Sequence, residues 1–343
     1  MYIIPRKLGN DYCIDQIDER ALLDWGALDR YPKLHQLDYE GYDKTLITWL
    51  AKRRSVKHLI WQMPGLTGDF DFRRTHLEQI SIQAAKAQTI RLPRCAKGLF
   101  FLQHHGTEKI RVEAPRQGAD VDVTIGMGSS TPPRMPEGLS GIASLGVWWA
   151  ECVKIKPLLG CTALERLHLG GDPTFALPDP QHLAKFRMLR ELELDGAYEM
   201  EASRFPALPR LETLRIRGTI KETAAVLRER FSKIDLEITG IKSVEWIRAN
   251  VGNPFRDWDD DHGARIAAVA KKAWKAAKRL DDRASLAAVK KALKPFIAVF
   301  NRLDATGDVD TIMREEIYDA FCELVPKRHQ DAAEAMFDAM RDF

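Results

Sequence analysis

One spacing of apolar residues recurs through the middle of the chain and constrains its fold more than any other feature. The spacing is apolar-x-x-apolar-x-apolar, and its successive starts lie within the range of roughly 20–29 residues that is typical of short solenoid repeats. A repeat of this length predicts one short strand per coil of a solenoid, with successive strands stacked in a parallel sheet. The spacing occurs at Ile142/Leu145/Val147, Leu164/Leu167/Leu169, Leu189/Leu192/Leu194, Leu211/Leu214/Ile216 and Phe231/Ile234/Leu236.

The spacing is less regular before residue 140. We predict an N-terminal cap over residues 1–54, with a helix from about Tyr42 to Arg54, and a solenoid over 55–252 that is irregular to about 140 and regular over 142–238. Two strand-like runs around a polar turn, within residues 110–125, predict a β-hairpin. The irregular matches are Val56/Leu59/Trp61, Leu77/Ile80/Ile82, Ala87/Ile90/Leu92, which starts too soon after the previous match for a full coil, and Thr107/Ile110/Val112.

The repeat stops near residue 253, and helical spacing replaces it. Apolar stripes at i, i+3 and i+7 begin at Ile266, Leu286, Ile317 and Ala332, and Pro295 is expected to kink or break the second of these helices. The pattern predicts a compact all-α domain over 253–343.

Composition limits the function only weakly. The 343 residues are 45% hydrophobic and 29% charged, which is ordinary for a globular protein, and the net charge is +3. A charge this small gives no general argument for binding nucleic acid or membranes. The five cysteines are scattered and no apolar run is long enough for a signal peptide or a membrane span, so we expect a cytoplasmic protein.

The concave face of the solenoid is the main candidate for a binding site. Side chains alternate between the two sides of a strand, so residues between the buried apolar positions face the concave side. Aromatic and Arg residues carry much of the energy of protein interfaces. The alternative is a solvated sheet whose neighbouring strands pair their charges. The candidate partner-binding residues are Trp148, Arg166, His168, Glu191, Glu193, Asp195, Arg215 and Arg217.

A basic helical stretch over residues 264–294 is a second candidate. It carries Lys and Arg side chains that could follow a phosphate backbone: Arg265, Lys271, Lys272, Lys275, Lys278, Arg279, Lys290, Lys291 and Lys294. Acidic residues follow between Asp304 and Glu323, so internal charge pairing is the favoured interpretation and nucleic acid is the less favoured partner.

Residues 304–315 partly match a calcium-binding loop, with oxygen donors at positions one, three, five, seven and twelve. Val309 stands where the loop needs glycine. The alternative is a helix–loop–helix in which Asp310 or Thr311 caps the second helix. We therefore predict no metal and no cofactor.

Other chemistry-bearing patterns are weak. His104 and His105 are adjacent in a strand-like run and would point in opposite directions. His262 follows three aspartates, and the Gly-rich segment 126–131 lacks the lysine and helix of a phosphate loop. The sequence has no GxSxG, HExxH or kinase signature, so we expect no enzymatic activity.

The frames from Ile142 to Leu236 resemble the leucine-rich repeat superfamily. This resemblance implies an α/β solenoid, with a parallel β-sheet on the concave side and short helices on the convex side, here followed by a small all-α domain. The segments 253–258 and 300–316 resemble the helical tail of some bacterial leucine-rich repeat proteins. The function implied is a non-catalytic scaffold that binds another protein.

Three narrower functions remain as alternatives. The resemblance to bacterial proteins suggests a toxin-neutralising immunity protein, and the basic stretch suggests nucleic-acid binding. A ubiquitin-ligase-like effector would need a nucleophilic cysteine followed closely by aspartate. Cys322 lies in the apolar run Phe321-Cys-Glu-Leu324, which is typical of a core segment.

Overall fold

The computed structural model divides into two compact units, Met1–Ile247 and Arg248–Phe343. It describes residues 6–8, 11–15, 23–62, 68–84, 88–103, 110–127, 135–149, 153–171, 176–250, 253–256, 258, 262–277 and 283–342. Each unit has its own cluster of buried apolar side chains.

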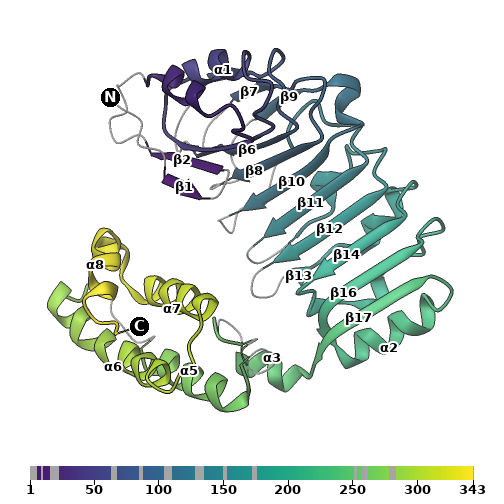
Figure 1. The fold of residues 1–343 in the computed structure, drawn as a ribbon. Helices are drawn as coiled ribbons and strands as arrows, with labels where there is room; N and C mark the ends of the chain where they lie inside the picture. Colours follow the sequence, from purple (N-terminus) through teal and green to yellow (C-terminus); the bar gives the residue numbers. More distant parts are fainter. Residues whose placement is uncertain are drawn as a thin grey trace. The chain divides into compact units, whose positions relative to one another are not determined.

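The first unit is a solenoid built around one long sheet (Figure 1). Twelve strands are hydrogen-bonded in the order β1-β2-β3-β4-β6-β8-β10-β11-β12-β14-β16-β17, and all neighbours are parallel except β1 and β2. The strands are β1 (Arg6–Leu8), β2 (Asp11–Asp15), β3 (Gln36–Glu40), β4 (His58–Gln62), β6 (Gln79–Ala84), β8 (Gly98–Gln103), β10 (Asp122–Met127), β11 (Ser144–Trp149), β12 (Arg166–Gly171), β14 (Glu191–Asp195), β16 (Thr213–Ile220) and β17 (Asp235–Lys242).

The predicted leucine spacing sets the register of this sheet. The second apolar position of each frame meets the same position of the next coil, so Leu145, Leu167, Leu192, Leu214 and Leu236 form one row. The first four are at most 2% exposed. Burying such a row removes apolar area from water at every coil, which is why stacked coils are stable and a single coil is not.

The front half of the solenoid is more regular than the sequence suggested. A second parallel sheet, β5-β7-β9, accompanies the main one and consists of β5 (Gly68–Asp71), β7 (Gln88–Arg91) and β9 (Ile110–Glu113). The matches at Ile90 and Ile110 therefore belong to this second sheet, while Ala87 and Thr107 lie outside the described residues. The main strand between these matches is β8, which the four irregular matches do not include.

The predicted hairpin within residues 110–125 is wrong for the same reason. β9 pairs with β7, whereas β10 pairs in parallel with β8 and β11. The polar turn at Arg116 is instead part of a short 3-10 segment, Pro115–Gly118, that leads from one sheet to the other.

The back half of the solenoid replaces the second sheet with helical turns on its convex side (Figure 1). The 3-10 turns are Lys156–Leu158, Pro180–Lys185 and Ala202–Arg204, and the last coil carries the helix α2 (Lys221–Arg230). Two short strands, β13 (Ala176–Leu177) and β15 (Glu199–Met200), pair in parallel between these turns. This is the α/β architecture that the repeat predicts.

The segment that the sequence analysis assigned to a cap contributes β1, β2 and β3 to the main sheet, together with α1 (Thr45–Leu50) and the 3-10 turn Trp25–Arg30. One buried carboxylate joins the 3-10 turn to the start of α1. Asp43, which is 4% exposed, accepts hydrogen bonds from the Leu23 amide, the Trp25 indole and Thr45. Burial alone would raise the pKa of Asp43, but these hydrogen bonds outweigh it and leave the pKa below its usual value.

The second unit is helical, as predicted. Its helices are α5 (Ala264–Ala277), α6 (Leu286–Asp304), α7 (Thr311–Leu324) and α8 (Ala333–Asp338), and α3 (Val244–Asn250) spans the boundary between the units. Ser285 caps α6 and Asp310 caps α7 through side-chain hydrogen bonds. The helix α6 continues through Pro295, and its apolar stripe packs in the core with Phe255 and Trp258.

Candidate functional site on the concave face

The concave face of the back half is formed by three in-register rows of side chains. We use this name for the outward-facing residues of β10, β11, β12, β14, β16 and β17. The rows are Asp122/Ser144/Arg166/Glu191/Thr213/Asp235, then Thr124/Gly146/His168/Glu193/Arg215/Glu237, then Gly126/Trp148/Gly170/Asp195/Arg217/Thr239. All eight candidate residues of the sequence analysis lie in these rows, and all point away from the buried leucines.

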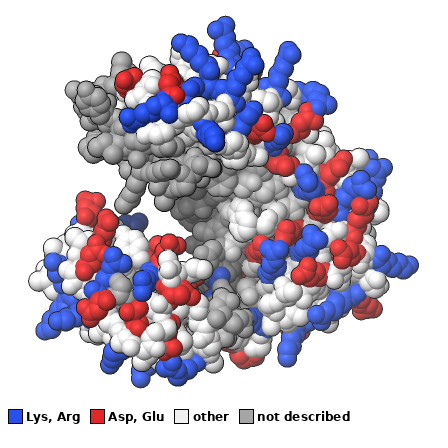
Figure 2. Space-filling model, in the orientation of Figure 1, with Lys and Arg blue, Asp and Glu red and all other residues white. Residues whose placement is uncertain are grey.

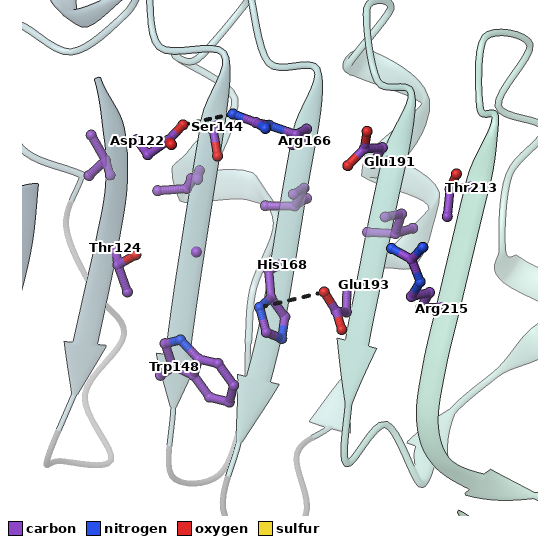
Figure 3. Close-up of a pocket in the computed structure, with 15 residues that line it drawn as sticks. Asp122, Thr124, Ser144, Trp148, Arg166, His168, Glu191, Glu193, Thr213 and Arg215 are labelled. Atoms are coloured by element: carbon purple, nitrogen blue, oxygen red, sulfur yellow. Dashed lines mark hydrogen bonds and ion pairs between the residues drawn. The ribbon is translucent and has the colours of Figure 1, made fainter. Parts of the chain in front are cut away.

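A depression of about 270 Å3 lies at the centre of this face. Its floor is Gly146, which has no side chain between its register partners on the two neighbouring strands. These partners are Thr124 and His168, which Figure 3 labels. A Cβ at position 146 would lie 3.2 Å from Thr124 Oγ1, so even alanine would crowd this floor. Glycine at this position therefore leaves room between the side chains of the neighbouring strands.

Trp148 lies at the edge of the depression and is 41% exposed. Its ring meets the His168 ring edge-on, with centroids 4.5 Å apart. The ring also covers Gly170, where a Cβ would come within 2.6 Å of two ring carbons. Gly170 therefore allows the tryptophan to lie close over the neighbouring strand, which holds an exposed aromatic side chain in a defined place.

The charged candidates form ion pairs on this face. Arg166 binds Asp122 at 2.8 Å, across the strand between them (Figure 3). Arg215 lies 3.6 Å from Glu237, and Arg217 lies 2.8 Å from Glu193. Such partly exposed pairs each contribute about 0–1 kcal/mol. The alternative interpretation of a sheet with paired charges therefore describes part of this face correctly.

Glu191 differs from the paired Arg166 because its exposed carboxylate forms no hydrogen bond or ion pair within the described ranges. It lies in the first row, between Arg166 and Thr213. Figure 2 shows blue and red side chains interspersed over the strands of the first unit, rather than one large patch of either sign. The face therefore offers local contacts instead of a long-range field.

Phe100 is a further exposed aromatic residue that sequence reasoning missed. It is 37% exposed, lies on β8 and continues the middle row, as the register partner of Thr124. The signal was present, since Ala96, Leu99 and Phe101 follow the repeated spacing and are buried. Recognising that frame would have placed Phe100 on the same face as Trp148.

The three aspartates of the calcium-like loop are engaged by other groups of the protein. Asp304 lies 3.2 Å from Arg314, Asp308 lies 2.7 Å from Arg265, and Asp310 accepts from the Met313 amide as the N-cap of α7. The geometry matches the capped helix–loop–helix alternative. His104, His105 and the three aspartates before His262 lie outside the described residues.

Two cations of the basic stretch are also engaged by side chains of the protein. Arg265 is paired with Asp308, and Lys271 donates to the side chain of Asn250 at 2.9 Å. Lys278 and Arg279 lie outside the described residues. Cys322 is half-buried, and burial raises the pKa of its thiol, which is opposite to what activates a nucleophilic cysteine.

Comparison with known proteins adds little to this picture. No family model and no curated protein matches the chain. A similar solved structure is the crystal structure of the LRIM1/APL1C complex, with 12% identity and a TM-score of 0.33 over 98% of this chain and 92% of that one. The solenoid fold of the first unit is instead established by its own repeat length and strand register. Among the described residues, no helix is long and apolar enough to cross a membrane.

Proposed function

We propose that this protein is a non-catalytic scaffold that binds another protein on the concave face of its solenoid. The observation that carries the proposal is the exposed Trp148 beside the Gly146 depression. A fixed aromatic side chain next to a recess is the usual form of an interface anchor, because it buries a large area and loses little conformational freedom.

Phe100 extends this anchor region toward the front half. Between the two aromatic residues the middle row holds Thr124 and Gly146, which carry no charge. Covering uncharged side chains costs less desolvation than covering ions. We therefore place the energetic centre of the interface between β8 and β11.

The paired charges of β12 to β17 then serve as the rim. In a rim, charges set orientation and exclude wrong partners more than they add affinity. Arg166, His168, Glu193, Asp195, Arg215 and Arg217 have this role in the proposal, and the unpaired Glu191 provides an acceptor for a basic side chain of the partner.

The proposal is tested by affinity capture with matched baits. Wild-type protein, Trp148→Ala and Arg215→Ala are immobilised at equal density, and proteins retained from the native host are quantified by mass spectrometry. The expected partner is retained by wild type and Arg215→Ala and is depleted by Trp148→Ala. A partner retained equally by all three baits would place the interface elsewhere.

A further inference from the structure

The residues His168, Glu193 and Asp195 form a group with the composition of a metal site. Glu193 and Asp195 are two residues apart on β14, so both carboxylates point to the same side of the sheet. His168 on β12 is the register partner of Glu193. One nitrogen or oxygen from each of the three side chains lies within 4.8 Å of the others.

The three side chains of this group lie next to one another, and His168 forms a hydrogen bond with Asp195. His168 Nε2 lies 2.7 Å from Asp195 Oδ2, and His168 Nδ1 lies 3.9 Å from Glu193 Oε2. The three side chains are 26%, 25% and 17% exposed for His168, Glu193 and Asp195. They are therefore partly withdrawn from water while remaining open to the concave side.

A second observation points to a cation. The other oxygen of Asp195, Oδ1, is buried and has no hydrogen-bond partner among the residues that the structure describes. A buried acceptor without a partner is costly, and a carboxylate rotates readily to share both oxygens with a cation. The network as it stands therefore leaves one of its acceptors unsatisfied.

We propose that His168, Glu193 and Asp195 bind a divalent first-row transition metal ion, with Zn²⁺ as the best match. One imidazole and two carboxylates are ligands that zinc accepts, whereas Mg²⁺ and Ca²⁺ prefer oxygen ligands throughout. Three protein ligands leave a coordination position for water or for a side chain of a bound partner. The site goes beyond the proposed scaffold function, because metal binding is measured on the protein alone.

Arg217 is the internal competitor of this ion. Its guanidinium lies 2.8 Å from Glu193 Oε1 and 3.6 Å from Asp195 Oδ2, on the carboxylates that the metal needs. Its side chain is 58% exposed and can move into solvent. Removing Arg217 should therefore strengthen metal binding, whereas an ion-pair network with no metal-binding role gives no such gain.

The test is isothermal titration of the full chain with ZnSO₄. Wild type is expected to bind one Zn²⁺ at this site, and His168→Ala and Asp195→Asn are each expected to weaken binding by about tenfold or more. Arg217→Met is expected to tighten binding. The matched control is Glu191→Gln, a carboxylate on the same strand and face but outside the group, which should leave the affinity unchanged.

Titration with Co²⁺ gives a second readout, because visible absorption bands report coordination directly. These bands should appear in wild type and disappear in His168→Ala. Circular dichroism in EDTA checks that each variant is folded without metal. Tighter Zn²⁺ binding by Arg217→Met is a second control, because unfolding would not produce it. The proposal is overturned if wild type binds no Zn²⁺, if the His168→Ala/Asp195→Asn double variant binds it as tightly as wild type, or if Arg217→Met does not tighten binding.

Discussion

The middle row of the sheet changes character between β11 and β12. From β4 to β11 its residues are uncharged, whereas from β12 to β17 every residue is ionisable. The two stretches are Ile60/Ser81/Phe100/Thr124/Gly146 and His168/Glu193/Arg215/Glu237. The same backbone geometry thus carries two different surfaces.

We infer that the charged stretch contributes to stability, whereas the uncharged stretch contributes to recognition of a partner. In the charged stretch, side chains of opposite sign stand on adjacent strands, and the pairs they form satisfy one another. A partner gains little by covering them, since each pair would lose its water. The residues of the uncharged stretch form no ion pairs that a partner would have to disrupt. The exposed Phe100 lies in this stretch, and the exposed Trp148 lies on β11, where the stretch ends.

The largest loss of stability should result from changing a buried leucine beneath the sheet. Leu192 is 1% exposed, between the exposed Glu191 and the half-buried Glu193. Leu192→Asp buries a charge without a partner and should lower the free energy of unfolding by more than about 3 kcal/mol. Urea denaturation measures it, with Glu191→Asp as the control on the exposed side. Equal midpoints for Leu192→Asp and wild type would show that the register is wrong.

A buried charge in the first coils should matter more than the surface charges of the last ones. Asp43→Ala removes the acceptor of several buried hydrogen bonds and should cost about 2–3 kcal/mol. Denaturant titration at neutral pH measures this loss. If Asp43→Ala lowers the free energy of unfolding by less than Glu193→Gln does, the buried charge matters less than the surface charge and the prediction is wrong.

The same residue gives a pH dependence. Because the folded-state pKa of Asp43 is lowered, its contribution is fully present above the unfolded value of about 4 and is lost as the pH falls through the folded value. Wild-type stability should therefore fall below about pH 4, and the fall should be smaller in Asp43→Asn. Denaturant midpoints between neutral and acidic pH check this, and identical pH profiles for the two proteins would count against it.

Gly170 links the two surfaces, since it determines where Trp148 lies. Gly170→Ala should push the tryptophan ring away and weaken partner binding, while stability changes by about 1 kcal/mol or less because the ring is exposed and can move. The matched control is Gly160→Ala, where a Cβ meets nothing within 4 Å. Thermal melting and partner binding are both measured. If Gly170→Ala and Gly160→Ala weaken binding equally, the close packing of Trp148 on Gly170 does not determine binding.

The smallest effect should be the pairing energy within the charged stretch. A double-mutant cycle of Glu193→Gln and Arg217→Met should give a coupling of about 0.2–1 kcal/mol that decreases with added salt. Denaturation at low and high ionic strength measures it. A coupling of several kcal/mol, insensitive to salt, would mean that this network is a main source of stability.

The sequence predicted the back half of the fold well because the frames there have large apolar residues at all three positions, as at Leu189, Leu192 and Leu194. In the front half the strands of the second sheet use similar residues, so Ile90 and Ile110 imitate the main frame. The true strand β8 contains the last two positions of a frame that opens with Ala96, a small residue that gives a weak signal.

The candidate site could be predicted only as a set of outward-facing positions. Strand alternation alone indicates that Trp148 and Glu191 are exposed. It does not indicate that Arg166 reaches Asp122 across an intervening strand, or that His168 lies diagonal to Asp195 and near it. These contacts depend on side-chain length and rotamer, which no one-dimensional spacing encodes.

The measurement that tests the central claim most directly is the dissociation constant of the captured partner for three variants. Phe100→Ala and Trp148→Ala should each weaken binding by about 2 kcal/mol, or roughly 30-fold. Arg215→Ala should change it by less than about threefold, since its charge is already paired within the sheet. The account is contradicted if Arg215→Ala weakens binding more than Phe100→Ala and Trp148→Ala do.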